Sequence, residues 1–315
     1  MEIYKRLFFS QEVGNISNCE FMGCISNNLH GGAIYSIFGI IIKNCLFRWN
    51  SSPKGGAIYC KGTCNIDMCS FSECSSDFGG GIVSTNSSRL KIIRNSFYGM
   101  NSYDCSCIYG ENSVFSISNI SFCGSENNYG VIYHKYSDIT VDNSIFFEIT
   151  SKFNPGISIY NTRTAKIERC FFLMLHQSNS RLDSGLILLF DSQNTFCTFD
   201  YCVIRIMSLT NVPAFFATEM SSVLVNGLCS SYTESVLIRN TKNIVFSKNC
   251  NFGTHTQCPL PMQSFRNVGY MHNIVEMKKK NHLKEAFFGV VISFSIVMYA
   301  FSGVGYTFIL MKQFN

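Results

Sequence analysis

The chain has few charged residues, little proline and almost no tryptophan. Only 14% of its 315 residues are Asp, Glu, Lys or Arg, against about 25% in an average globular protein. Low charge together with 46% hydrophobic residues excludes a disordered solvating chain, which has the opposite balance. Five prolines exclude a proline-rich linker, and a net charge of +5 over this length is too small for a nucleic-acid-binding surface. We therefore expect a folded protein with no nucleic-acid partner.

One segment near the C-terminus has no charge at all. No Asp, Glu, Lys, Arg or His lies between Phe287 and Met311, and a helix needs about 20 such residues to cross a bilayer core. The pattern predicts a single transmembrane helix over 286–311. A polar and basic juxtamembrane segment, 263–285, precedes it, and a short tail, 312–315, follows it. The membrane is thus the first expected partner.

The orientation in the membrane is open to two interpretations. The first fourteen residues contain no apolar run of a secretory signal, and lysines gather before the helix rather than after it, which favours a cytosolic, tail-anchored protein. Sixteen cysteines favour export instead. So do four glycosylation sequons, whose asparagines are Asn15, Asn50, Asn86 and Asn119. We expect the large domain to face outside, at the cell surface.

Internal repeats dominate the rest of the chain. A phenylalanine recurs at gaps of 24 to 26 residues, with Asn or Cys two or three positions before it, at Phe21, Phe47, Phe71, Phe97, Phe122, Phe146 and Phe172. Ile204, Leu228 and Phe252 continue this column at gaps of 24 residues. Half a period away, Gly-Gly-Ala-Ile-Tyr occurs at 31–35 and 55–59 and fades afterwards. Such a fixed period is typical of a solenoid.

The composition of each repeat selects the kind of solenoid. Short β-branched and aromatic runs are separated by Asn, Gly and Ser clusters, which is the pattern of strands and turns. No repeat holds a helical pattern long enough for a helix, and the leucine-rich frame is absent. We predict an all-β fold: a parallel β-helix over 15–262, of about ten coils of ~25 residues, preceded by an N-terminal segment or partial coil over 1–14.

Each column then has an expected position in the coil. Phe and Ile point inward and stack, whereas the Asn column, such as Asn44, fits a corner with positive φ. Gly-Gly pairs mark a tight bend before the next strand. One further column is expected to face solvent: Lys43, Asp67, Asp142, Glu168 and Asp200.

The motifs resemble a known family. Gly-Gly-Ala-Ile at 31–34 and 55–58, together with the F-x-x-N of Phe47 and Asn50, is similar to the GGA[ILV]/FxxN repeats of polymorphic outer-membrane proteins. The resemblance covers about residues 15–160 by motif and 161–260 by periodicity. It implies a right-handed parallel β-helix displayed on a cell surface for adhesion or host interaction. The predicted C-terminal helix departs from that family, which ends in a β-barrel.

An enzyme is the second functional class to weigh, because some β-helices cleave polysaccharides. Such lyases and hydrolases need clustered or paired carboxylates, yet no Asp-Asp, Gly-His-Gly or Arg-Ile-Lys string occurs. Lys43, Asp67 and Arg94 fit a surface charge ladder instead. We predict no catalytic residue, and we keep a membrane-tethered polysaccharide lyase or hydrolase as the alternative.

Cysteine and histidine offer a metal-site hypothesis. Cys60 and Cys64 match only half of a zinc pattern. Cysteines that share a column fit small apolar core positions better: Cys19, Cys45, Cys69, Cys170 and Cys202. The isolated histidines are expected in loops: His30, His134 and His176. We predict neither metal nor cofactor.

The favoured function is therefore a non-enzymatic, single-pass membrane protein that presents its β-helix for adhesion, to a protein or glycan ligand. A tyrosine column is the feature that could carry such a surface: Tyr35, Tyr59, Tyr109, Tyr133 and Tyr160. Ordinary packing is the plainer interpretation of the same column. Convergent Asp, Arg or Lys side chains on one face would favour the enzyme.

Overall fold

The computed structural model describes residues 2–86, 89–178, 185–191, 195–205, 213–218, 220–238, 243–247 and 249–253. The chain divides into two compact units, Met1–Ser264 and Phe265–Asn315, and every described residue belongs to the first. The predicted juxtamembrane segment, transmembrane helix and tail (263–285, 286–311 and 312–315) lie outside the described residues. Within the described part, no helix combines the length and the apolar character needed to span a bilayer.

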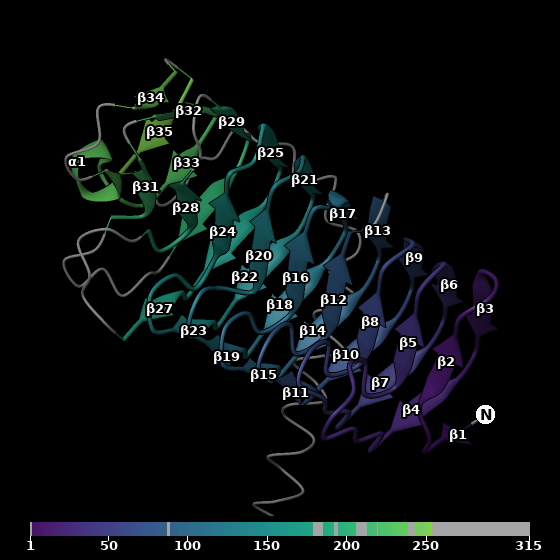
Figure 1. Ribbon diagram of the computed structural model, residues 1–315. Coiled ribbons are helices and arrows are strands. Elements are labelled where there is room, and N and C mark those ends of the chain that lie inside the picture. Colours follow the sequence, from purple (N-terminus) through teal and green to yellow (C-terminus); the bar gives the residue numbers. More distant parts are fainter. Residues whose placement is uncertain are drawn as a thin grey trace, which may run out of the picture. The chain divides into compact units, whose positions relative to one another are not determined.

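The first unit is an all-β parallel solenoid, in which each coil lies against the next (Figure 1). Among the described residues, sheet A holds eleven parallel strands: β1 (Glu2–Ile3), β4 (Glu20–Met22), β7 (Leu46–Arg48), β10 (Ser70–Ser72), β14 (Ser96–Tyr98), β18 (Ser121–Cys123), β22 (Ile145–Phe147), β26 (Phe171–Leu173), β30 (Val203–Arg205), β33 (Cys229–Ser230) and β35 (Asn251–Phe252). Sheet B holds nine in the same ranges: β2 (Leu7–Phe9), β5 (Ile34–Ser36), β8 (Ile58–Cys60), β12 (Ile82–Thr85), β16 (Ile108–Glu111), β20 (Ile132–Lys135), β24 (Ile157–Tyr160), β28 (Leu188–Asp191) and β31 (Phe215–Ala217).

Two further sheets complete the cross-section. Of the described strands, sheet C holds ten: β3 (Gly14–Ser17), β6 (Gly39–Lys43), β9 (Thr63–Asp67), β13 (Arg89–Ile93), β17 (Val114–Ser118), β21 (Ile139–Asp142), β25 (Thr164–Glu168), β29 (Thr195–Asp200), β32 (Ser221–Asn226) and β34 (Ile244–Phe246). The short sheet D follows sheet A in the middle coils: β11 (Ser75–Ser76), β15 (Asn101–Ser102), β19 (Glu126–Asn127), β23 (Thr150–Ser151) and β27 (His176–Gln177).

The parallel β-solenoid predicted from the repeats is confirmed. About eight turns, from β2 to β30, repeat the order sheet B, sheet C, sheet A. The sequence predicted about ten coils, and the two that follow Arg205 are less regular. In the last one, the short helix α1 (Glu234–Leu237) replaces most of a sheet B strand, and Ile238 makes an isolated bridge to Phe215.

The predicted phenylalanine column forms a continuous stack inside the solenoid. Phe21, Phe47, Phe71 and Phe97 are fully buried at the centres of successive sheet A strands. Their ring centroids lie 4.7 to 4.9 Å apart, with the planes within 6° of parallel. That distance equals the spacing of neighbouring strands, about 4.7–4.9 Å. Strand pairing therefore sets the ring stacking.

The column does not continue through Leu228 as predicted. Ile204 pairs with Ser230, and Ser230 pairs with Phe252. The coil from Ile204 to Ser230 is longer than the 24 residues that the prediction assumed, so Leu228 lies two positions earlier. It accepts a backbone hydrogen bond from Asn251 and falls in the column of Cys202. A buried serine thus interrupts the apolar stack near its C-terminal end.

The asparagine column occupies the corner between sheets C and A, as predicted. Asn18, Asn44, Asn119 and Asn143 all have φ between 47° and 56°. Asparagine tolerates this left-handed conformation better than other residues with a Cβ atom. Where the sequence lacks Asn, other residues adopt the same φ: Met68, Arg94, Arg169 and Tyr201. The stacked backbone therefore imposes the corner, and asparagine reduces its cost.

The Gly-Gly pairs leave no room for a side chain. Gly31 has φ +70°, and a Cβ on it would lie 2.1 Å from the carbonyl oxygen of Ile34. A Cβ on Gly32 would lie 2.2 Å from the carbonyl oxygen of Gly56, one coil away. Both contacts are too short for any side chain. The tight bend expected at these pairs is present, and close packing between coils requires the second glycine.

Asn50 of the F-x-x-N motif joins two coils. Its Oδ1 accepts from the Cys24 amide at 2.9 Å, and its Nδ2 donates to the Phe21 carbonyl at 3.1 Å. The residue is fully buried. Without Asn50, the Cys24 amide would be a buried donor without a partner. The amide is structural, so the sequon at Asn50 is closed to a glycan in the folded protein.

Substituting Phe71 by Ala tests the stack. Removing this fully buried ring should lower the free energy of unfolding by about 3–5 kcal/mol, because it opens a cavity between two rings. Chemical denaturation of the two proteins measures the difference. Phe38→Ala is the matched control, because Phe38 is 54% exposed. Equal losses in both variants would contradict the stack as the main source of stability.

Candidate functional site

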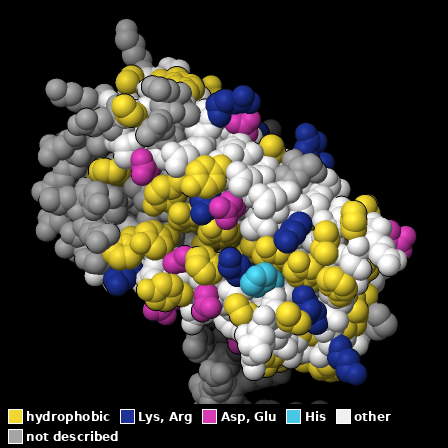
Figure 2. All heavy atoms as spheres, viewed as in Figure 1, with side chains coloured by type: hydrophobic (Ala, Val, Ile, Leu, Met, Phe, Trp, Pro, Cys, Tyr) yellow, Lys and Arg dark blue, Asp and Glu magenta, His cyan; other side chains and the backbone are white. Residues whose placement is uncertain are grey.

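Aromatic side chains follow one another along the outer face of sheet B. Side chains alternate between the two faces of a strand, so the residue after each buried isoleucine points outward, as Tyr35 does after Ile34. We name the aromatic stripe by its members: Phe8, Tyr35, Tyr59, Tyr109, Tyr133 and Tyr160. Figure 2 shows hydrophobic side chains on this face of the molecule, with basic and acidic side chains between them.

The rings of the stripe stack in two groups. Tyr35 lies 5.3 Å from both Phe8 and Tyr59, and Tyr133 lies 5.2 Å from Tyr109 and 5.0 Å from Tyr160. Val83 pairs with both Tyr59 and Tyr109 and separates the groups. The centre of the stripe is packed, because Tyr59 is 6% and Tyr109 9% exposed.

Tyr160 does not share the tyrosine register that the sequence suggested. Tyr133 pairs with Ser158, and Tyr160 pairs with Lys135. The ring of Tyr160 nevertheless reaches back to stack on Tyr133. The column is therefore four tyrosines interrupted by Val83, with a fifth ring that joins from two residues further along the strand.

Cations lie over several of these rings. The Arg6 guanidinium carbon is 4.9 Å from the Tyr35 centroid, and Lys135 Nζ is 5.7 Å from that of Tyr109. Lys135 also forms an ion pair with Glu111 at 3.3 Å. Such contacts join a positive charge to an aromatic surface. The stripe thus offers rings, hydroxyls and cations on one face.

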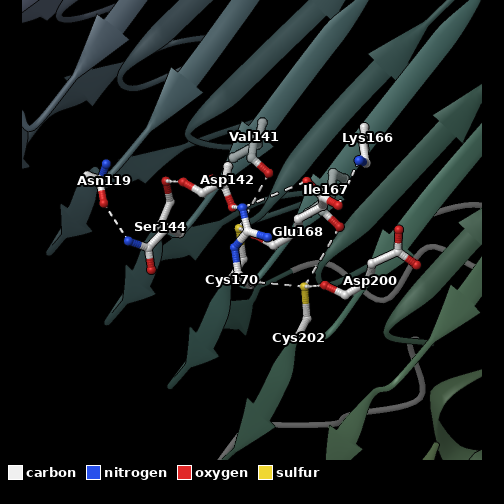
Figure 3. A network of polar contacts seen from close by, with 12 residues as sticks. Asn119, Val141, Asp142, Ser144, Lys166, Ile167, Glu168, Cys170, Asp200 and Cys202 are labelled. Carbon is white, nitrogen blue, oxygen red and sulfur yellow. Dashed lines mark hydrogen bonds and ion pairs between the residues drawn. The ribbon is translucent and has the colours of Figure 1, made fainter. Parts of the chain in front are cut away.

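A second polar arrangement lies on the outer face of sheet C. Asp142, Glu168 and Asp200 end the consecutive strands β21, β25 and β29, and they pair in register. We call these three residues the acidic ladder. Figure 3 shows their side chains at neighbouring strand ends, with Lys166 beside Glu168. The outward position predicted for this column is confirmed, since each is only half-buried.

Basic side chains pair with two members of the acidic ladder. Lys166 Nζ lies 2.8 Å from Glu168 Oε1, and an Arg169 nitrogen lies 2.6 Å from Asp142 Oδ1. The hydrogen bond to Asp142 raises the pKa of Arg169. Burial raises the pKa of Asp200, and the nearby charge of Glu168 adds to this effect. Both effects favour the protonated form of Asp200.

The acidic ladder places carboxylates on adjacent coils, which the search for sequence strings missed. Neighbouring strands lie about 4.8 Å apart, close to the ~5–5.5 Å between the carboxyl groups of retaining glycosidases. Asp142, Glu168 and Asp200 are separated by 26 and 32 residues, so no local motif reveals the cluster. The shared outward column was the available signal.

The predicted charge ladder is present at the N-terminal end of the same face. Arg94 forms a two-point ion pair with Asp67, and Lys43 pairs in register with Asp67 on the other side. The side chains of Arg94 and Asp67 are 48% and 22% exposed. An exposed pair of this kind contributes about 0–1 kcal/mol. The Arg94–Asp67 pair therefore balances the charge on the outer face of sheet C and adds little to the stability of the fold.

His134 was expected in a loop, and this was wrong. It lies in β20 and points inward, fully buried beside the ring of Phe115. Its Nε2 lies 2.9 Å from the Ser113 carbonyl, so Nε2 carries the proton, and Nδ1 lies 3.3 Å from the Thr162 hydroxyl. His176 begins β27, so the loop expectation fails there too, whereas His30 lies outside the strands.

The cysteines lie mostly inside the solenoid. Cys45 and Cys69 share a column, and the Cys45 amide donates to Cys69 Sγ at 3.4 Å; Cys170 and Cys202 repeat this at 3.3 Å. Cys229 is disulfide-bonded, and the other cysteines in the described ranges are free thiols. Among those residues no three His, Cys, Asp or Glu side chains group to hold a metal ion.

Comparison with family models, with curated proteins and with solved structures finds no match to this chain. The resemblance to polymorphic outer-membrane proteins therefore rests on the repeat motifs and on the solenoid alone.

His134 should make the fold sensitive to acid. Burial lowers its pKa to about 4, against about 6.5 in an unfolded chain, so the stability that depends on neutral imidazole is complete above pH 6.5 and is lost as the pH falls. Between pH 7 and pH 4 this one residue should cost about 3 kcal/mol. Unfolding at both pH values measures it, with His134→Gln as the comparison. An identical pH dependence in the two proteins would refute the assignment.

Proposed function

We propose that this chain is a non-enzymatic, membrane-anchored surface protein whose β-helix presents the aromatic stripe to a ligand. The observation that carries the proposal is the stripe itself. It places stacked rings, hydroxyl groups and cations together on one outer sheet face. Aromatic residues and Arg are the types enriched in binding surfaces. The plainer alternative is packing, and it accounts for Tyr59 and Tyr109 but not for the half-exposed Tyr35 and Tyr133.

The solenoid suits display. Each coil adds one row of outward residues at a fixed spacing, so the stripe spans successive coils as a rigid surface. The resemblance to displayed repeat proteins and the uncharged segment 286–311 support an anchor at one end. The sequons add to this, because Asn15 and Asn86 are exposed in the solenoid. A right-handed coil and adhesion to a protein or glycan partner complete the proposal.

Surface display is tested by treating intact cells that express the full chain with protease and glycosidase. We expect external protease to digest the solenoid and glycosidase to increase its gel mobility. The combined Asn15→Gln and Asn86→Gln variant should lose most of that shift, because Asn50 is buried and Asn119 is half-buried. Full protection from protease, with no mobility shift, would instead support a cytosolic, tail-anchored β-helix.

A membrane-tethered, carbohydrate-active enzyme is the second candidate, because the acidic ladder supplies the convergent carboxylates that such an enzyme needs. In this candidate, Asp200, with its raised pKa, is the general acid, and Glu168, held by Lys166, is the nucleophile. The ion pairs that occupy Asp142 and Glu168 favour a structural role over this one.

A polysaccharide panel separates the two candidates. We expect the full chain to release no reducing ends from neutral or acidic polysaccharides. If it does release them, Asp200→Asn and Glu168→Gln should each abolish the activity, whereas Glu126→Gln, an exposed carboxylate of β19, should leave it intact. Activity with that pattern of variants would replace the adhesion proposal.

A further inference from the structure

Four basic side chains gather at the N-terminal end of the aromatic stripe. Arg6 lies over the Tyr35 ring, and the His30 ring centroid lies 4.9 Å from that of Tyr59. Lys61 directly follows strand β8, which carries Tyr59, and Lys54 lies before the Gly-Gly bend that leads into it; both lysines lie close enough to His30 to act on its charge. We call Arg6, His30, Lys54 and Lys61 the cationic patch.

The cationic patch has no counter-charge within the described residues. Arg6, Lys54 and Lys61 form no ion pair there, and neither do Lys43 and Lys91 on sheet C. Six other cations of the solenoid do form ion pairs: Arg48, Arg94, Lys135, Arg163, Lys166 and Arg169. His30 reflects the excess of positive charge. Burial lowers its pKa first, and Lys54, Lys61 and Arg6 each lower it further, with no carboxylate acting against them.

The rings beneath the patch select the kind of ligand. Tyr35 is stacked between Phe8 and Tyr59, and Arg6 also lies against the ring, so no ring face is open. A nucleic-acid base needs an open ring face for stacking, which Tyr35 does not offer. The Tyr35 hydroxyl has no hydrogen-bond partner among the described residues, and it is free to bond a sugar hydroxyl.

We propose that the cationic patch binds the acidic group of an anionic glycan, whose chain continues along the aromatic stripe. This proposal rests on the ligand-presenting function proposed above and names the ligand class. The patch supplies cations without ion pairs for a carboxylate or sulfate, and the half-buried rings of Tyr35 and Tyr133 supply apolar surface on the same sheet face. The coil spacing of about 4.8 Å is close to the length of one sugar unit in an extended chain, so successive sugars meet successive strands.

Binding of defined oligosaccharides to the purified full chain in detergent tests the proposal. The probes are a sulfated heparin hexasaccharide, a carboxylated hyaluronan hexasaccharide, neutral cellohexaose and a single-stranded hexanucleotide. We expect at least one acidic oligosaccharide to bind more tightly than cellohexaose and the hexanucleotide. The sulfated and carboxylated probes then show which acidic group the patch accepts.

Variants connect the binding to the patch. The combined Lys54→Gln and Lys61→Gln variant should weaken the acidic oligosaccharide about tenfold, because it removes two unpaired charges at the ligand. The combined Lys43→Gln and Lys91→Gln variant removes the same charge from the outer face of sheet C and should leave affinity within about twofold. Tyr35→Phe should weaken binding without changing stability.

Three results would overturn the proposal: no binding of either acidic probe, equal loss in both lysine variants, or a hexanucleotide that binds as tightly as the glycan. None of them would affect the surface-display result, which depends on protease and glycosidase access alone. A chain that is displayed at the surface but ignores acidic glycans would keep its proposed function and need another ligand. A chain that is not displayed would remove both.

Discussion

Parallel hydrogen bonding between successive coils is the constraint on which the whole structure depends. Each strand pairs with the equivalent strand about one repeat further along, so residues of one column lie a single strand spacing apart. An inward column must then be one that stacks well on itself, which phenylalanine and isoleucine do. In an outward column of charged residues, like charges repel one another across one strand spacing, and this repulsion must be relieved. Each residue lies beside the residue one repeat further along the chain, so both must satisfy the same packing requirement. The sequence repeats for this reason.

This constraint explains which features the sequence predicts well. The phenylalanine stack, the positive φ of Asn44 and its equivalents, and the Gly32 contact all follow from self-stacking of identical residues. They can be recognised in the sequence because the same residue type recurs in each column. The prediction failed at Leu228 because it assumed a coil of 24 residues. The coil is longer, and the strand hydrogen bonds place Ser230 rather than Leu228 in the phenylalanine column. The prediction for His134 failed because one polar residue in an inward column is satisfied by Ser113 and Thr162, which no local pattern indicates.

The candidate surfaces were only partly predictable for the same reason. The tyrosine column and the column of Asp142, Glu168 and Asp200 could be found from their spacing. Their electrostatics could not, because the partners come from other positions: Arg169 reaches back one coil to Asp142, and Lys166 bonds its own strand neighbour Glu168. A stacked column of like charges is unfavourable, so the protein must supply counter-charges locally. Sequence periodicity shows the column but not the side chains that neutralise it.

The outer faces of sheets C and B differ in how they supply counter-charges to their charged columns. This difference indicates which face suits a charged ligand. On sheet C, Asp67, Asp142 and Glu168 each have a basic partner, so repulsion within the columns is relieved internally. At the N-terminal end of sheet B, Arg6, Lys54 and Lys61 are grouped without carboxylates. Grouping like charges weakens the folded state unless something outside the chain compensates. An acidic ligand would supply the counter-charge to this group, which is why the proposed ligand belongs on sheet B rather than on sheet C.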